Sequence, residues 1–231
     1  MRGAFSKGIT HSIPIALGYL SVSFGFGILA VGLDIPVLGA VLISLTNLTS
    51  AGQAAGVEII AAAGTIIEMI LTQFVINLRY ALMGFSLTQK LDKSFTTPKR
   101  LLLSFGITDE VYAVAISQKG NISARYMAGL ITLPIIAWTS GTLLGAIAGQ
   151  LLPEIISSSM GIVLYGMFIA IFLPVSRGDK RVLTVVIIAV ICSLVFKYLL
   201  AVSGGFSVIL SAVIASVIGA IFYPVDQEET T

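Results

Sequence analysis

The chain has 231 residues, of which 57% are hydrophobic and 10% charged, and its formal net charge is +2. Soluble domains carry about 25% charged residues, so a water-soluble fold could not bury this much apolar surface. The basic residues are scattered among short connections, which argues against nucleic-acid binding, and the single cysteine, Cys192, excludes a disulfide or a thiolate metal cluster within the chain.

Six apolar segments have the length of a membrane crossing. A helix that spans a hydrocarbon core of about 30 Å needs roughly 20 mostly apolar residues. Such segments cover residues 12–32, 58–80, 126–150, 155–175, 182–200 and 206–224. The first follows a basic N-terminus but continues without a small-residue cleavage site, so we expect a retained helix and not a signal peptide.

Two further segments, residues 37–57 and 101–118, are apolar at their ends and small or polar in the middle. Each could cross the membrane or re-enter on one side, because irregular backbone at membrane depth survives only where protein or a wet cavity satisfies it. The sequence therefore predicts an all-α polytopic transmembrane helix bundle with six crossings and two broken or re-entrant segments, or with eight crossings. We expect one transport domain over residues 1–224 and a short polar tail over residues 225–231.

The basic residues favour the first of these topologies. Arg2 and Lys7 place the N-terminus in the cytoplasm by the positive-inside rule. The loop over residues 85–100 carries Lys90, Lys93, Lys99 and Arg100. This loop is cytoplasmic if both irregular segments are re-entrant and extracellular if both cross the membrane. Both topologies leave the C-terminus in the cytoplasm.

The first polar cluster is Ser50-Ala51-Gly52-Gln53, within residues 37–57. Small residues allow the backbone to approach a ligand closely, and a helix break here would direct amide groups and a helix N-terminus at an anion such as a carboxylate. Small residues are also common where membrane helices pack together. The stretch is a candidate substrate cradle, with helix packing as the alternative.

Three of the polar residues in the predicted crossing 58–80 are candidate functional residues. Glu68 lies near its centre, where a charged carboxylate costs at least a few kcal/mol, so we expect it to be protonated, paired or facing a cavity. Arg79 could bind a carboxylate through two hydrogen bonds, although a position near a helix end also fits snorkelling. Glu68 is a candidate for proton or ion coupling, and Asn77 and Arg79 are candidate substrate ligands.

The third cluster, Thr108-Asp109-Glu110, interrupts the segment 101–118. Paired acids in a membrane segment could bind an ammonium group or relay protons. A threonine followed by acids is also a usual helix start, because the hydroxyl caps free amides and the acids face the positive end of the helix dipole. Helix capping accounts well for Thr108 and one acid, but less well for two acids in a membrane segment. All three residues are candidate substrate ligands, and both acids are candidates for proton or ion coupling.

Other patterns point to packing and to the absence of enzyme chemistry. Gly141, Gly145 and Gly149 repeat every four residues, a spacing typical of close helix contacts. His11 is the sole histidine, so we expect no metal site. No P-loop for ATP and no Ser/His or Cys/His set is present. We therefore expect neither an enzyme nor a cofactor.

The motifs SAGQAAG, NLRYALMGFSL and TDEVYAV, with the N-terminal GITHSIPIALGYLSVSFGFG and the glycine-rich last span, resemble the AzlC-type branched-chain amino-acid permease family, large subunit. The resemblance implies a secondary transporter subunit that exports branched-chain or related small amino acids across a prokaryotic cytoplasmic membrane. It implies a small AzlD-type membrane subunit as partner and leaves room for a homo-oligomer. The family often has phenylalanine-alanine-glycine-serine in place of Thr49 to Gly52, and Glu68 is outside its motifs, which leaves the exact substrate open.

We expect alternating access around a site at mid-membrane. Backbone amides near Ser50 to Gln53, together with Arg79, would take the carboxylate of a zwitterionic amino acid, and Asp109 or Glu110 would take its ammonium group. The alternatives are an ion or small-solute channel, which would show flux without saturation, and a non-transporting membrane assembly subunit.

Overall fold

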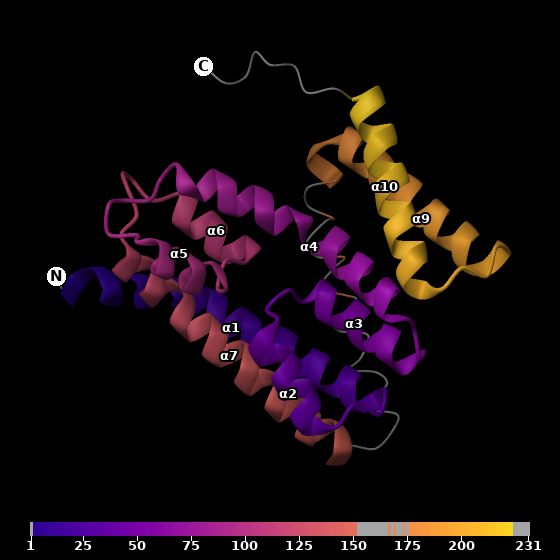
Figure 1. Ribbon diagram of the computed structural model, residues 1–231, viewed down its shortest axis with the longest axis horizontal. Helices are drawn as coiled ribbons and strands as arrows, with labels where there is room; N and C mark the ends of the chain where they lie inside the picture. Colours follow the sequence, from indigo (N-terminus) through magenta and orange to yellow (C-terminus); the bar gives the residue numbers. More distant parts are fainter. Residues whose placement is uncertain (1, 152–165, 167–168, 170–172, 174–175, 224–231) are drawn as a thin grey trace. The chain divides into compact units, whose positions relative to one another are not determined.

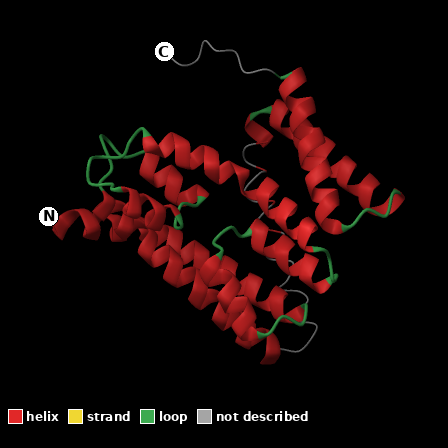
Figure 2. Cartoon of the chain, in the orientation of Figure 1, coloured by secondary structure: helices red, strands yellow, loops and turns green. Residues whose placement is uncertain are grey.

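The computed structural model describes residues 2–151, 166, 169, 173 and 176–223, and the regular elements within them are helices (Figures 1 and 2). The elements are α1 (Arg2–Gly32), α2 (Val37–Thr46), α3 (Ala51–Ala61), α4 (Ile66–Thr88), α5 (Thr97–Ser104), α6 (Asp109–Ile116), α7 (Ala124–Leu151), α9 (Lys180–Leu194), the π-helical η1 (Val195–Leu199) and α10 (Gly204–Phe222). The chain is therefore an all-α polytopic membrane protein, as predicted.

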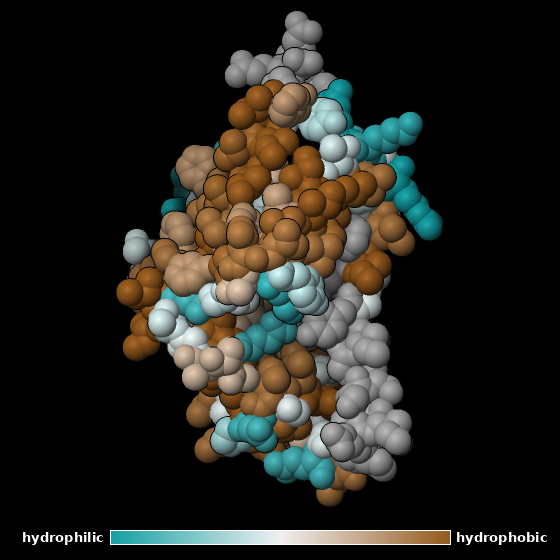
Figure 3. Space-filling view, turned by 90° about the vertical axis from the view of Figure 1, so that its right-hand side faces the viewer, coloured by the Kyte–Doolittle hydropathy of each residue, from teal (hydrophilic) through white to brown (hydrophobic). Residues whose placement is uncertain are grey.

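Helices α1, α4, α7, α9 with η1, and α10 are long and apolar enough to cross a membrane. All carry large apolar side chains that are exposed, and the face drawn in Figure 3 is mostly apolar. These five helices correspond to five of the six predicted crossings. The sixth, residues 155–175, lies almost entirely outside the described residues.

The predicted crossing 58–80 has the wrong boundaries. Residues 58–61 belong to α3, a turn follows, and α4 begins at Ile66. The turn places Ala63 at φ 51°, and the Glu68 amide donates to the Thr65 hydroxyl over 3.1 Å. Thr65 and Glu68 have the spacing of a capping box, a helix-start signal. Hydrophobicity alone did not reveal this start, because apolar residues continue on both sides of the turn.

The described residues form two compact units. The first unit comprises Met1–Val57 with Ile76–Leu164, and the second comprises Glu58–Val75 with Tyr165–Thr231. Helices α3 and α4 each contribute residues to both units. Helices α1, α2, α5, α6 and α7 belong to the first unit, as do both hairpin tips.

Helices α1 and α7 pair closely along the first unit, and glycines permit this approach. A Cβ atom added at Gly145 would collide with the Phe24 carbonyl, and one at Gly141 would collide with the Leu20 backbone and the Ser23 side chain. Gly27 of α1 abuts the Thr142 carbonyl in the same way. The predicted packing role of the glycine stripe is confirmed, with α1 as the neighbouring helix.

Helices α2 and α3 form a hairpin whose tip is residues 47–50. Gln53 of α3 donates from Nε2 to the Ser44 hydroxyl of α2 over 2.9 Å. Ala40 and Val57, farther from the tip, share one buried cluster with the C-terminal part of α1. Leu48, at the tip, instead joins a buried cluster that contains the middle of α1. The hairpin therefore enters from the C-terminal end of α1 and turns back near its middle.

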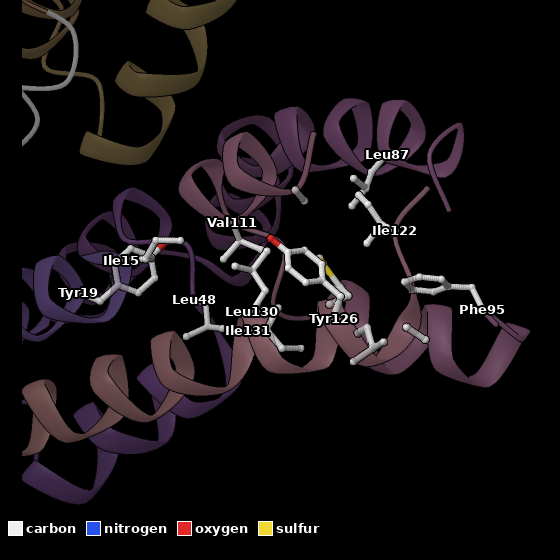
Figure 4. Close-up of a cluster of buried hydrophobic side chains, with 14 of the residues drawn as sticks. Ile15, Tyr19, Leu48, Leu87, Phe95, Val111, Ile122, Tyr126, Leu130 and Ile131 are labelled. Carbon is white, nitrogen blue, oxygen red and sulfur yellow. The ribbon is translucent and has the colours of Figure 1, made fainter. Parts of the chain in front are cut away.

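Helices α5 and α6 form a second hairpin, with residues 105–108 at its tip, that enters from the opposite end. Its outer end is joined to the start of α7, because Asp92 N–H donates to the Ile122 carbonyl over 2.9 Å and Ala124 N–H donates to the Ser94 hydroxyl over 2.9 Å. Near its tip, Val111 packs in the same buried cluster as Tyr19 and Leu48 (Figure 4). Both segments predicted to be broken or re-entrant are thus pairs of short helices with irregular backbone between them.

Candidate functional site

The two hairpin tips converge on the middle of α1 and α7. The Tyr19 hydroxyl of α1 lies 2.6 Å from the Thr108 hydroxyl and 2.5 Å from a carboxylate oxygen of Glu110. The Tyr19 ring packs edge-to-face on Trp138 of α7, with ring centroids 5.0 Å apart. Trp138 Nε1 donates to the Gln53 side-chain carbonyl over 2.8 Å. A continuous chain of contacts therefore runs from the second tip through α1 and α7 to the start of α3.

Both polar atoms of the Gln53 side chain take part in this network. Besides accepting from Trp138, its amide donates to Ser44, whose hydroxyl lies 2.6 Å from that of Thr142. All four side chains are buried. Gln53 therefore anchors the first hairpin to α7, and a substrate contact in this stretch would fall to the backbone and to neighbouring residues.

The tip of the first hairpin carries backbone strain and unsatisfied polar groups. Ser50 adopts the left-handed conformation at φ 49°, which is uncommon for residues other than glycine and concentrates at functional positions. The hydroxyls of Thr49 and Ser50 are buried and have no hydrogen-bond partner among the described residues. Since buried polar groups are normally paired, these hydroxyls suit a polar ligand or water. Ala51 and Gly52 follow directly in the first turn of α3.

Arg79 and Asp109 form an ion pair, with Nη1 and Oδ2 separated by 2.6 Å. Their side chains are 45% and 46% exposed, so the pair is accessible from one side. Arg79 also donates to the Tyr80 hydroxyl over 3.1 Å and lies over the Tyr80 ring. The expected position of Arg79 near a helix end is wrong, because α4 extends to Thr88 and leaves Arg79 near its middle. Snorkelling is therefore a poor explanation for this residue.

The start of α6 explains why two acids follow Thr108. The Thr108 hydroxyl caps the helix by accepting from Val111 N–H at 3.4 Å. The two acids then diverge, with Asp109 pairing with Arg79 and Glu110 with Tyr19. The start of α6 therefore combines helix capping with contacts to Arg79 and Tyr19.

Asn77 lies on α4, one helical turn before Tyr80, and its side chain is partly buried.

Glu68 belongs to the second unit and takes part in none of the site contacts described above. The expected position of Glu68 at the centre of a crossing is wrong: it occupies the first turn of α4, because that helix begins only at Ile66. Its side chain is 5% exposed and accepts from the Ser203 hydroxyl over 2.5 Å and from Gly205 N–H over 2.9 Å. The N-terminus of α10 therefore holds this carboxylate as an anion would be held.

Comparison with known proteins places the chain in a family. The family described as AzlC protein matches residues 14–152. The chain belongs to the AzlC family. It is 31% identical to a membrane protein of Archaeoglobus fulgidus over 75% of this chain and 77% of the relative, and 29% identical to the inner membrane protein YgaZ of Escherichia coli over 78% and 76%.

A third relative carries a functional name. The branched-chain amino acid transport protein AzlC of Bacillus subtilis is 22% identical over 77% of this chain and 70% of the relative. No solved structure matches the chain. The residues matched by the AzlC family model contain α1 from Pro14 onward, both hairpins, α4 and α7.

Sequence reasoning missed several members of this AzlC-family network. They are Tyr19, Ser44, Tyr80, Trp138 and Thr142. Tyr80 directly follows Arg79 in the motif NLRYALMGFSL, so its position was a signal for it. The others are isolated polar or aromatic residues in apolar helices, and no spacing links one to another. Trp138 is the single tryptophan of the chain, which does not distinguish a network member from a core residue.

Proposed function

We propose that this AzlC-family chain is the large subunit of a secondary transporter that exports branched-chain or related small amino acids. The Arg79–Asp109 ion pair carries this proposal. Two opposite charges that are both half-exposed, near the middle of α4 and at a hairpin tip, match the two charged ends of a zwitterion. The name of the Bacillus subtilis relative supports the substrate class.

In the proposed mechanism the substrate exchanges with the ion pair. Its carboxylate binds the Arg79 guanidinium, which can donate two parallel hydrogen bonds, and its ammonium group binds Asp109. Total charge is unchanged by this exchange, so no net charge has to be moved into the membrane. The amides at the start of α3, with the Thr49 and Ser50 hydroxyls, provide further polar contacts, and Asn77 and Thr108 border the pair in sequence.

Movement of the two tips would provide alternating access. The tips enter from opposite ends and are joined through Tyr19 and Trp138, so displacement of one changes the contacts of the other. We propose Asp109 and Glu110 as the acids that respond to a coupling proton or ion. Glu68 is a third candidate for coupling, but its hydroxyl and amide donors favour a role in holding α10.

The distribution of charge supports a cytoplasmic N-terminus. Residues 85–88 and 97–100 of the predicted loop are helical, and residues 89–96 connect α4 to α5. The contacts of residues 92–94 with residues 122–124 bring this basic segment to the end of the first unit that holds Lys7. The Lys7 ammonium lies 6.0 Å from the centre of the Tyr126 ring. By the positive-inside rule this end faces the cytoplasm of a prokaryotic cell. We propose this orientation in the cytoplasmic membrane, a cytoplasmic C-terminus, and a small AzlD-type partner subunit with or without homo-oligomerisation.

Export of labelled leucine from proteoliposomes, with and without the small partner, tests the proposal. We expect saturable export that unlabelled valine inhibits, and at least tenfold slower export by Asp109→Asn and Arg79→Gln, because each loses a charged hydrogen bond worth about 1.5–3 kcal/mol. Asp34→Asn and Arg125→Gln are matched controls at exposed positions. Full activity in both site variants would refute the site, and flux without saturation or competition would favour the channel.

A further inference from the structure

A pocket of about 270 Å³ lies at the basic end of the first unit. It is lined by the last turns of α4, the following loop, α5, Ile107 of the second hairpin tip and Met127 of α7. Its lining is mostly apolar, including Leu87, Leu91, Phe95 and Leu103. Neither the substrate site nor the proposed transport mechanism uses this pocket.

One cation lines the pocket. The loop and α5 carry four basic residues and one acid, Asp92, whose carboxylate is occupied by the Ser94 amide and hydroxyl. Lys90 donates to the carbonyls of residues 116 and 118, and Lys99 donates to the Ser94 carbonyl. Arg100 forms no ion pair with any described residue, and its side chain lines the pocket. The pocket thus combines apolar walls with an unpaired guanidinium.

Helix α5 places this pocket where a bilayer changes from tails to headgroups. Leu101 and Leu102 are 73% and 74% exposed, as expected of side chains that face lipid tails. Lys99 and Arg100 precede them directly on the same short helix, which begins with Thr97-Pro98. Basic residues beside exposed leucines are typical of a helix at the membrane interface.

We propose that the pocket binds an anionic phospholipid, with an acyl chain among the apolar side chains and the phosphate on the Arg100 guanidinium. Arginine binds phosphate oxygens through two parallel hydrogen bonds, and basic pockets on the cytoplasmic side of membrane proteins bind anionic headgroups. A free amino acid fits less well, because no acidic side chain lines the pocket to receive an ammonium group. This inference is independent of the transport proposal.

Lipid binding to the purified full chain in detergent tests the inference, with bound lipid counted by native mass spectrometry. We expect long-chain phosphatidylglycerol to bind in preference to phosphatidylcholine, and Arg100→Gln to weaken phosphatidylglycerol binding about fivefold, as removal of one basic residue near an anionic surface predicts. Lys93→Gln removes a neighbouring charge that does not line the pocket and is the matched control. Equal losses in the two variants, or equal binding of both lipids, would overturn the proposal.

A second variant tests the apolar part of the pocket without changing charge. Gly84 lines the pocket, and no atom lies within 4 Å of a Cβ added there, so Gly84→Leu should fill the space while the helix is retained. We expect this variant to lose long-chain phosphatidylglycerol binding, and Gly84→Ala to keep it. Retained binding in Gly84→Leu, or equal competition by a short-chain phosphatidylglycerol, would show that no acyl chain occupies the pocket.

Discussion

Two regions of this protein hold a carboxylate in a membrane helix, and they do so in different ways. Asp109 at the second hairpin tip is half-exposed and paired with an equally exposed arginine. Glu68 is almost fully buried and is held by a hydroxyl and a backbone amide at the start of α10. A charge that must exchange partners needs access, whereas a charge that fixes a helix needs burial and several donors. On this basis we propose substrate exchange for Asp109 and attachment of α10 for Glu68.

Removal of both members of the ion pair should separate transport from folding. We expect Arg79→Gln with Asp109→Asn to reduce leucine export roughly a hundredfold, because two charged hydrogen bonds to the substrate are lost. The double variant should nevertheless be at least as heat-stable as either single variant, since each single change leaves one unpaired charge at membrane depth.

Melting temperature in detergent and export in proteoliposomes, measured on the same three preparations, check this prediction. If the double variant melts well below both single variants, the ion pair serves mainly to hold α4 to α6. The distinction between an exchanging charge and a fixed charge would then fail for the first unit.

For Glu68 the expected effect is on stability. Glu68→Ala leaves the Ser203 hydroxyl and the Gly205 amide without their acceptor, which should lower the free energy of unfolding by about 2 kcal/mol. Glu68→Gln keeps a carbonyl acceptor and should lose less than half of that amount. Chemical denaturation followed by circular dichroism, which reports the helices of both units, provides the stability, and export is measured in parallel.

The glutamine variant distinguishes the two roles of Glu68. A protein that folds as well as the parent yet no longer exports leucine would place Glu68 in proton or ion coupling. Retained export with a small loss of stability supports attachment of α10. Gly205→Ala offers an independent check, because a Cβ there would lie 2.7 Å from a Glu68 carboxylate oxygen and force the two apart.

The sequence predicted those features of the two regions that depend on residues within a single segment. Five helix crossings and the two broken segments, 37–57 and 101–118, were predicted correctly because hydrophobicity and small residues act within one segment. The predicted start of α4 was wrong, because Thr65 and Glu68 set the true start through a helix cap inside an apolar run. The same error moved Glu68 to the centre of the helix and Arg79 to its end.

The pairings themselves could not be predicted, because they join segments far apart in the chain. Arg79 and Asp109 were each singled out, but one sequence does not show that they meet. Tyr19 and Trp138 were not singled out, since an aromatic residue in an apolar helix is usually part of the core. Their role follows only once the edge-to-face contact and the two terminal hydrogen bonds are known.

A variant that weakens the link between the hairpin tips should have the smallest effect on export. Tyr19→Phe keeps the ring on Trp138 but removes the hydroxyl that contacts Thr108 and Glu110, a loss of about 1 kcal/mol. If the link couples the two tips, the variant should lower the maximal export rate several-fold and leave KM nearly unchanged, because neither proposed substrate charge is altered.

Tyr126→Phe is the matched control for this link. It removes a hydroxyl that joins α7 to α1, through a 2.9 Å contact with His11, at the basic end and not at the tips. Both variants lose a tyrosine hydroxyl that joins α1 to another helix, α6 for Tyr19 and α7 for Tyr126, so a general weakening of the contacts of α1 would slow export in both. A rate loss confined to Tyr19→Phe would therefore locate the coupling at the tips, whereas equal rates would leave the hairpins mechanically independent.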